Sequence, residues 1–218
     1  MKIRLVTLVL AILLISCTTK SNAPSILSGQ VCGKTCWNNI TIGKTEKQEF
    51  LETISALHNV DQTSITIFDE SSGSLFDGNI VFQYYRVVGD KNSLVNISAR
   101  TNNQKIIFMI FQGDLGLTFK DVSDAFGEPD FVSSLWTIDR GINVHFINSL
   151  EGVEITAYFK SEESSVSPDT EVNYLVLFDT DLYQTFQESD LFSPDYESLI
   201  LYPWTGYGKI EELYWPPQ

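Results

Sequence analysis

The chain has 218 residues, of which 43% are hydrophobic and 12% aromatic, and its 28 acidic residues against 14 basic residues give a net charge of −14. This apolar content excludes an intrinsically disordered chain and predicts a globular protein. The negative charge repels phosphate backbones, so no nucleic-acid partner is expected.

The first sixteen residues have the pattern of a secretory signal peptide. Lys2 and Arg4 form a short basic start, and an apolar run of 11 residues follows from Leu5 to Ile15. A membrane-spanning helix needs about 20 apolar residues, whereas the apolar part of a signal peptide needs about 7–15. We expect residues 1–16 to be removed, leaving 12 basic residues against 28 acidic residues and a net charge of −16.

Cys17 is the predicted site of lipid attachment. The preceding residues Leu14, Ile15 and Ser16 resemble a bacterial lipobox, in which a small residue precedes a cysteine that receives a diacylglycerol. Only a thiolate is nucleophilic enough to form the thioether, and two or three acyl chains, at about 0.8 kcal/mol per buried methylene, anchor a protein firmly. The alternative is an ordinary cleaved signal in which the cysteine has no special role.

The resemblance implies an extracytoplasmic protein anchored by its N-terminal lipid. The membrane is expected to be either the cytoplasmic membrane, at its outer face, or the outer membrane. Thr18 follows the lipidated cysteine in place of an aspartate, which favours the outer membrane where the host has one.

The segment after Cys17 is expected to be a tether with a cysteine pair. Thr18–Gln30 is small, polar and proline-containing, which is typical of a linker. Cys32 and Cys36 are the remaining cysteines, and an oxidising compartment favours a disulfide between them. Two reduced thiols or half of a metal site are the alternatives. Since the sequence has no second cysteine pair and its two histidines stand apart, no metal or other cofactor is expected.

A short helix is predicted near the start of the globular region. Thr45 and Gln48 have the spacing of a capping box, and the apolar residues Phe50, Ile54 and Leu57 fall on one helical face.

A second helix is predicted later in the chain. Thr118 is its N-cap, and Asp121 lies in the first turn, where the helix dipole favours an anion. Gly127 ends the helix, and Pro129 prevents its continuation. Its buried stripe is expected to comprise Phe119, Val122 and Phe126.

Strands are predicted after each helix. Val95, Ile97 and Ala99 alternate with polar residues, as in a half-buried antiparallel strand, and Val153–Lys160 shows the same alternation. Asn102-Asn103 is expected to form a hairpin turn. The predicted strands are Ser64–Phe68, Ile80–Val88, Leu94–Thr101, Lys105–Phe111, Phe131–Ile138, Asn143–Asn148, Val153–Lys160 and Val172–Phe178.

The two helix-then-strand runs share one design. Gly43 and Gly116 each precede a capping threonine by two residues and lie 73 positions apart, which indicates an internal repeat. We therefore predict an α+β fold of two tandem units, each a short helix packed on an antiparallel sheet. The predicted divisions are the signal peptide (1–16), the lipidated cysteine and tether with the cysteine pair (17–36), the first unit (37–112), the second unit (113–180) and an aromatic, acidic C-terminal segment (181–218).

Short motifs in these units resemble known families. The Gly-x-Thr opening of each helix, the segment Phe126-Gly127-Glu128-Pro129 and the segment Cys36-Trp37-Asn38-Asn39-Ile40 are similar to motifs of several bacterial lipoproteins. The related groups are tandem-repeat β-lactamase-inhibitor-protein-like domains and small outer-membrane assembly lipoproteins of the BamE/SmpA kind. The resemblance covers Trp37–Phe178 and implies their helix-plus-sheet fold, and no inhibitory or assembly residue is carried over.

The sequence contains no catalytic constellation. No Gly-x-Ser-x-Gly elbow is present. His58 is expected to be a polar group after the first helix, and His145 is expected to be exposed on a strand. Asp179-Thr180-Asp181 and Glu188-Ser189-Asp190 lack EF-hand spacing, so a solvated acidic face is favoured over calcium. We predict that the protein is not an enzyme, and the alternative is an envelope glycan-active or other hydrolase whose scattered acids pair in space.

Aromatic side chains are the candidates for binding. Gln83 and Tyr85 share one face of their strand while Phe82 and Tyr84 share the other, so one set points away from the core. Residues 179–218 add further rings, some of which are expected to pack on the sheet. Because Tyr and Trp are favoured at protein interfaces, we predict a non-enzymatic binding module of the cell envelope with a protein partner from the envelope or the extracellular space. The candidate binding residues are Tyr84, Tyr85, Trp204 and Tyr207.

Overall fold

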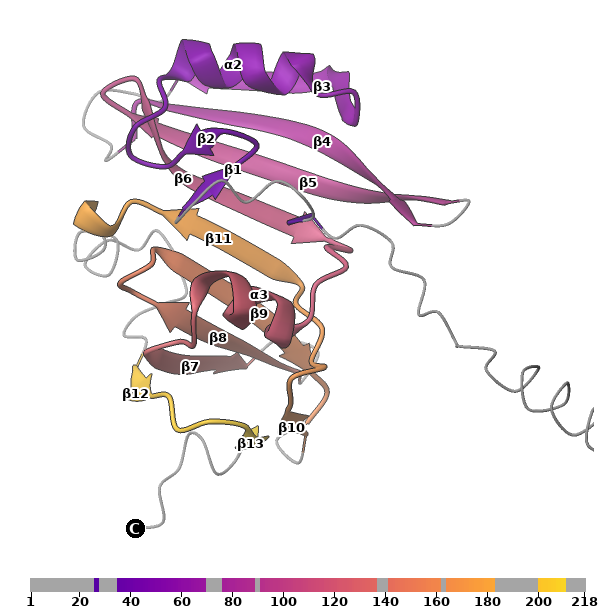
Figure 1. The fold of residues 1–218 in the computed structure, drawn as a ribbon, viewed down its shortest axis with the longest axis vertical. Helices are drawn as coiled ribbons and strands as arrows, with labels where there is room; N and C mark the ends of the chain where they lie inside the picture. Colours follow the sequence, from indigo (N-terminus) through magenta and orange to yellow (C-terminus); the bar gives the residue numbers. More distant parts are fainter. Residues whose placement is uncertain are drawn as a thin grey trace, which may run out of the picture.

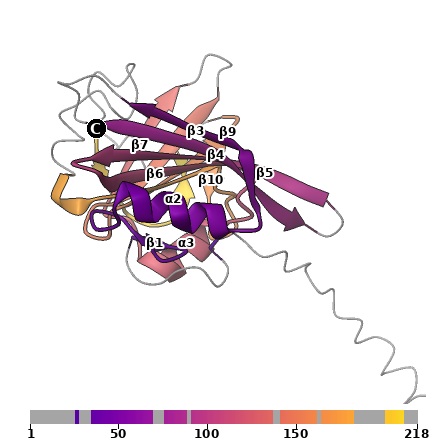
Figure 2. The ribbon, with the colours of Figure 1, turned by 90° about the horizontal axis from the view of Figure 1, so that it is seen from above.

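The computed structural model describes residues 26–27, 35–69, 76–88, 91–136, 141–161, 164–182 and 200–210. Within these ranges, nine strands form one antiparallel sheet, and both described helices lie on the same side of it (Figures 1 and 2). The helices are α2 (Lys47–Ala56) and α3 (Phe119–Phe126). From one edge of the sheet to the other, the strands are β12 (Tyr202–Pro203), β7 (Phe131–Trp136), β8 (Ile142–Asn148), β9 (Val153–Phe159), β11 (Tyr174–Phe178), β6 (Lys105–Gly113), β5 (Lys91–Asn102), β4 (Gly78–Val88) and β3 (Val60–Asp69).

Short elements complete the described fold. β1 (Cys36–Trp37) pairs with β2 (Ile40–Thr41), and β10 (Ser165–Val166) pairs with β13 (Gly208–Lys209). A turn of 3-10 helix, Thr180–Leu182, follows β11. Neither α2 nor α3, the helices of the described ranges, has the length and apolar composition of a transmembrane span.

The single sheet corrects the predicted α+β fold of two tandem helix–sheet units. The described chain is mostly β, and nine of its described strands form one continuous antiparallel sheet. Its centre is the pairing of β6 with β11, from Gln112 opposite Tyr174 to Phe108 opposite Phe178. β6 follows α2 in the chain and β11 follows α3, so the two runs join in one sheet. Local patterns indicated the strands, but they do not specify which strands pair over long sequence distances.

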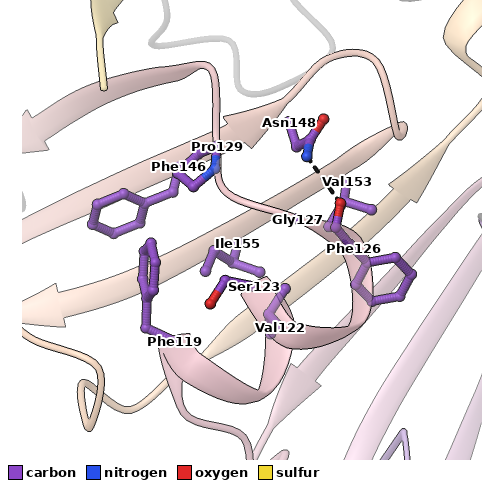
Figure 3. Close-up of a pocket in the computed structure, with 10 residues that line it drawn as sticks. All are labelled: Phe119, Val122, Ser123, Phe126, Gly127, Pro129, Phe146, Asn148, Val153 and Ile155. Carbon is purple, nitrogen blue, oxygen red and sulfur yellow. Dashed lines mark hydrogen bonds between the residues drawn. The ribbon is translucent and has the colours of Figure 1, made fainter. Parts of the chain in front are cut away.

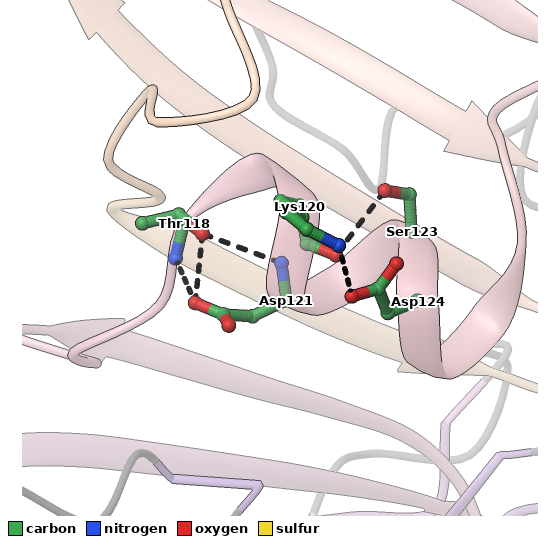
Figure 4. A network of polar contacts seen from close by, with 5 residues as sticks. All are labelled: Thr118, Lys120, Asp121, Ser123 and Asp124. Atoms are coloured by element: carbon green, nitrogen blue, oxygen red, sulfur yellow. Dashed lines mark hydrogen bonds and ion pairs between the residues drawn. The ribbon is translucent and has the colours of Figure 1, made fainter. Parts of the chain in front are cut away.

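The cap of α3 is confirmed. The Thr118 hydroxyl accepts a hydrogen bond from the Asp121 amide at 3.3 Å, and the Asp121 carboxylate accepts one from the Thr118 amide at 2.8 Å (Figure 4). Gly127, with φ of 89°, follows the last helical residue. The predicted stripe of this helix is buried against β8 and β9: Phe119, Val122 and Phe126.

The predicted capping box of α2 is wrong. The N-cap is Glu46, which makes no side-chain cap hydrogen bond. The Thr45 hydroxyl instead accepts a hydrogen bond from the Thr41 amide at 2.8 Å, within the turn that joins β2 to the helix. Gln48 donates to Glu52 at 2.8 Å. The apolar face of the helix is confirmed, since its first two predicted members are fully buried and the third is partly buried: Phe50, Ile54 and Leu57.

The main core lies between the helices and the sheet. Trp37 is fully buried, and its ring packs edge-on against Phe111 at 5.2 Å between ring centroids. The Trp37 ring nitrogen donates to the Ile26 carbonyl at 3.2 Å, and the Ile26 amide donates to the Leu115 carbonyl at 3.1 Å. Ile26 and Leu27, which were expected in the tether, are therefore buried parts of the core. The tether is shorter than the sequence predicted.

The β5–β6 hairpin is confirmed with its turn shifted by one residue. Asn102 pairs with Lys105, so the turn residues are Asn103 and Gln104, with φ of 49° and 62°. Two consecutive positive φ values are typical of the tight turns whose twist matches a hairpin. The alternation of buried and less buried residues along β5 is also confirmed.

Replacing Thr118 with alanine is expected to lower the free energy of unfolding by about 1 kcal/mol, because the Asp121 amide in the first turn of α3 loses its side-chain acceptor. Urea unfolding followed by circular dichroism measures this change. Thr53→Ala is the matched control, since the Thr53 hydroxyl is on the surface of α2 and bonds only the Glu49 carbonyl. Equal losses in both variants would contradict the capping role.

Candidate functional site

The face of the sheet opposite α2 and α3, here termed the open face, carries a continuous row of polar side chains. Residues paired directly across neighbouring strands point to the same side of a sheet. Within the described ranges, neither α2 nor α3 lies on this face (Figure 2). From β3 to β7 the row comprises Asp61, Gln83, Asn96, Gln112, Tyr174, Thr156, His145 and Ser133.

The end of this row on β7, β8 and β9 is buried. His145 is 5% exposed, and its Nδ1 lies 2.7 Å from Glu154 Oε1 and 3.2 Å from the Thr156 hydroxyl. The prediction that His145 is exposed was wrong. The position of His145 between two apolar residues indicates the face of the strand on which it lies, but it does not indicate whether that face is covered.

This buried cluster brings together residues that serve in nucleophilic catalysis elsewhere. Ser133 pairs in register with His145, and Glu154 contacts the imidazole, so the types and order of a Ser-His-acid set are present. However, Ser133 is only 1% exposed, and a substrate cannot reach its hydroxyl. Among the described residues, every buried side-chain nitrogen and oxygen has a hydrogen-bond partner. The cluster is therefore a satisfied polar core of the kind that fixes strand register.

A second part of the open face, at one end of β4, β5, β6, β11 and β9, is half-buried to exposed, whereas Phe108, Val176 and Phe178 on the same face are buried. Leu94 and Tyr158 are each 40% exposed. Gln112 donates to the Tyr174 hydroxyl at 2.8 Å. These accessible side chains are uncharged, although the chain as a whole has a net charge of −14. They form the open-face patch: Gln83, Tyr85, Leu94, Asn96, Gln112, Tyr158 and Tyr174.

Two tyrosine side chains of the patch, Tyr85 and Tyr158, each contact a neighbouring residue. Hydrogen bonds from the Thr63 hydroxyl and then the Thr63 amide hold the pKa of Asp61 below its usual value, and the Tyr85 hydroxyl donates to the same carboxylate. Tyr158 lies over Gly141, where an added Cβ would come within 2.2 Å of the ring. Glycine at this position leaves the space that the ring occupies.

The structure separates the predicted binding residues. Tyr84 is buried and its hydroxyl accepts a hydrogen bond from the Asn59 side-chain Nδ2 at 3.3 Å, so it is a core residue, while Tyr85 lies on the open face. Trp204 and Tyr207 meet each other on the opposite side of the sheet, beside α3. The Trp204 ring stacks on Phe119 with 5.4 Å between centroids, and Tyr207 is 44% exposed.

The predicted covalent sites fall mainly outside the described ranges. Cys17 and Cys32 lie there, so lipid attachment and the disulfide remain predictions. Cys36 is buried in β1, and its sulfur accepts a hydrogen bond from the Thr41 hydroxyl at 3.5 Å.

Two hollows adjoin the second helix. The apolar one under α3 has a volume of about 10 Å³, close to the minimum for one water molecule (Figure 3). It is therefore a packing gap rather than a ligand site. The second is a polar cleft of about 480 Å³ between the segments 113–118 and 171–173, and it contains the acids Asp114 and Glu171.

The described residues contain no group of three or more His, Cys, Asp or Glu side chains placed to hold a metal ion. His58 is exposed after α2, and Asp179 accepts a hydrogen bond from the Asp181 amide at 3.1 Å. The segment Glu188-Ser189-Asp190 lies outside the described ranges. Comparison with models of protein families, with curated proteins and with solved structures finds no match for this chain. The resemblance to the inhibitor-like and assembly lipoproteins therefore remains a prediction.

Removing either partner of the buried His145–Glu154 pair is expected to lower the free energy of unfolding by about 2–4 kcal/mol, because the other polar group stays buried without it. A double-mutant cycle of His145→Ala and Glu154→Ala is expected to give a coupling energy of about 1–3 kcal/mol. Urea unfolding gives the free energy of unfolding of the unaltered protein, the two single variants and the double variant.

The exposed pair Lys120–Asp124 on α3 supplies the control cycle (Figure 4). Its coupling is expected to stay below about 0.5 kcal/mol, since both side chains are in contact with water. Additive losses at His145 and Glu154 would refute a coupled buried pair.

Proposed function

We propose that this protein is a lipid-anchored, extracytoplasmic binding module of the cell envelope, without enzymatic activity. Its open-face patch holds a protein partner from the envelope or the extracellular space. One observation carries the proposal: a tyrosine-bearing patch of seven uncharged, half-buried to exposed side chains on one sheet face of a strongly acidic chain.

The composition of the patch fits a protein interface. The centres of such interfaces are depleted of charged residues and enriched in aromatic residues. Tyrosine offers a large contact area at a low entropy cost, and amide side chains adapt their hydrogen bonds to a partner. Between β4 and β9 the patch crosses four strand spacings, or about 19 Å. Paired strands support it from below, so little backbone order has to be gained on binding.

A hydrolase has less support from the geometry. The set Ser133, His145 and Glu154 is buried, and Asp114 in the polar cleft already accepts a hydrogen bond from the Ser93 hydroxyl at 2.7 Å. Trp204 and Tyr207 form a second, smaller aromatic surface. Both pack on Phe119 and close the core beside α3, which favours a structural role for them.

The location of the protein is proposed from the sequence alone. Cys17 carries the lipid, and the disulfide Cys32–Cys36 forms in the oxidising compartment. Since Ile26 is buried in the core, the tether is limited to the segment Thr18–Ser25. The protein therefore works close to the surface of its membrane.

Photo-crosslinking in the producing cells tests the binding face. A photoreactive phenylalanine derivative replaces Leu94 or Tyr158, both at the patch, or Leu150, a control that is 78% exposed in the β8–β9 turn. The same protein is expected to be captured at the two patch positions and not at Leu150, because only the patch is covered by the partner. Adducts are identified by mass spectrometry.

A second crosslinking experiment removes side chains of the patch. Gln112→Ala combined with Tyr174→Ala is expected to reduce the adduct at Leu94 by at least about tenfold, the loss that 1.4 kcal/mol of interface contact produces. Capture of different proteins at the two patch positions, or of the same protein at all three, would contradict the proposed face.

A further inference from the structure

β3 is an edge strand, and its backbone has a neighbouring strand on one side only. It ends the strand order of the sheet, and among the described strands only β4 pairs with it (Figure 1). The strand at the other edge, β12, has two residues, whereas β3 has ten. A long edge strand presents unpaired amide and carbonyl groups to which another strand can bond. β3 therefore offers the longer of the two edges to a further strand.

The hydrogen bonds of β4 indicate which backbone groups of β3 face outward. The Tyr85 amide of β4 donates to the Asn59 carbonyl at 2.8 Å. Backbone bonds of a strand alternate between its two neighbours, and β4 pairs with β5 without a register shift, so Val81 also bonds toward β3. Thr66, which pairs with Val81, therefore directs its backbone groups to β4. The isoleucines on either side of Thr66 direct their backbone groups outward.

The exposed part of β3 is uncharged and carries apolar side chains. Gln62–Phe68 contains seven residues without a charge, on a chain with a net charge of −14. Ile67 is 46% exposed and Phe68 is 51% exposed. Ile67 pairs with the core residue Ile80 and so lies on the helix side, while Phe68 lies on the open face. Because two copies of a strongly acidic chain repel each other, their close contact requires an uncharged surface such as this one.

β3 is complementary to itself when two copies run antiparallel and pair about Thr66. Each Thr66 then faces its counterpart on the open face. On the helix side, Ile65 of each copy faces Ile67 of the other, so apolar side chains meet apolar side chains. The outward backbone groups of these two isoleucines bond to each other across the contact, and the Thr66 pair lies between the bonded pairs.

The acids of β3 favour this register over its neighbours. Pairing about Thr66 places Asp69 opposite Thr63, so no acid faces an acid within the strand. Pairing about Ile65 would place Asp69 opposite Asp61, and like charges directly opposite each other destabilise a strand pair. Pairing about Ile67 would place Asp69 opposite the apolar side chain of Ile65. The register about Thr66 alone among these three avoids both conflicts.

We propose that two copies of this chain pair through β3, antiparallel about a two-fold axis at Thr66, and join their sheets into one. Side chains paired across strands point to the same side, so both open faces lie on one face of the joined sheet. The dimer therefore carries two open-face patches on that face. One strand from each copy makes a contact smaller than the about 1,200–2,000 Å² of stable interfaces, so the dimer is weak and reversible.

Disulfide trapping in the producing cells, with copper–phenanthroline as oxidant, tests the centre of the contact. Thr66→Cys is expected to give a disulfide-linked dimer, because residues that face each other in a pair without hydrogen bonds have Cα atoms about 4.5 Å apart, a distance that a disulfide bridges. The unaltered protein, with Cys17, Cys32 and Cys36, gives the background. Non-reducing electrophoresis measures the dimer, and mass spectrometry identifies the linked peptides.

Thr63→Cys is the matched control on the same strand. Thr63 is exposed, but it faces Asp69 in the proposed register. Six residue steps along the strand, or about 20 Å, therefore separate the two copies of position 63. The dimer from Thr66→Cys is expected to exceed that from Thr63→Cys at least about tenfold, because a disulfide cannot bridge Cα atoms more than about 7 Å apart.

A charge on the edge supplies the second pair of variants. Ile67→Asp, added to Thr66→Cys, is expected to reduce the trapped dimer at least about tenfold, because a charged side chain on an edge strand prevents its pairing. Leu150→Asp makes the same change at a side chain that is 78% exposed in the β8–β9 turn, and is expected to leave the dimer unchanged. Both sites are exposed, so both variants are expected to fold, which circular dichroism checks.

Three results would overturn the dimer. They are the absence of a dimer from Thr66→Cys, equal dimer from Thr66→Cys and Thr63→Cys, and equal effects of Ile67→Asp and Leu150→Asp. A disulfide between Thr66→Cys and a different protein would also overturn it, and would identify β3 as the edge for a foreign strand. These results leave the open-face patch untouched, since crosslinking at Leu94 and Tyr158 tests that surface separately.

Discussion

The pairing of β6 with β11 is the constraint on which the rest of the structure depends. Its five register pairs join the strands that follow α2 to those that follow α3. On the helix side, Phe111 and Leu175 enter the main core, and on the open face Phe108 and Phe178 form a second apolar cluster. Burial of such a side chain contributes about 1.5–3 kcal/mol. Apolar burial on both faces therefore fixes this pairing at the centre of the sheet.

The continuous sheet divides the molecule into a covered side and an open side. Both helices share one side, and the β1–β2 hairpin packs there through Trp37, so the polar row is left on the other side. Within that row, the end around His145 is buried and the end around Gln112 is accessible. One structural arrangement thus produces both a polar cluster that specifies register and a surface available to a partner.

The sequence predicted local structure better than pairing. The Thr118 cap, the apolar stripes of both helices and the alternation in β5 depend on neighbouring residues, and all of them are confirmed. The cap of α2 was wrong because Thr45 bonds back to Thr41, a contact set by the preceding β1–β2 hairpin. The expected division into two tandem units failed because β6 and β11 are more than sixty residues apart, and no local pattern specifies such a partner.

The candidate site was predictable only in part. Alternation in β4 required that one aromatic residue leave the core, and Tyr85 does so, whereas Tyr84 packs edge-on against Trp37. Tyr158 and Tyr174 were not singled out, although Tyr158 alternates with buried residues along β9. The signal for grouping them is the register between strands, which a single sequence does not provide. Burial of His145 was unpredictable for the same reason, because it depends on what covers the open face.

A pulsed EPR measurement tests the single sheet most directly. One pair of spin labels is placed at Thr66, exposed on β3, and at Leu150, exposed in the β8–β9 turn. A reference pair is placed at Thr66 and Asn103, which both lie in the part of the sheet formed by β3, β4, β5 and β6. Five strand spacings of about 4.8 Å separate β3 from β9. If the sheet is continuous, both pairs give one narrow distance distribution of similar width. A broad or multiple distribution for Thr66–Leu150 beside a narrow reference would show two bodies moving independently, and would contradict the sheet on which the open face depends.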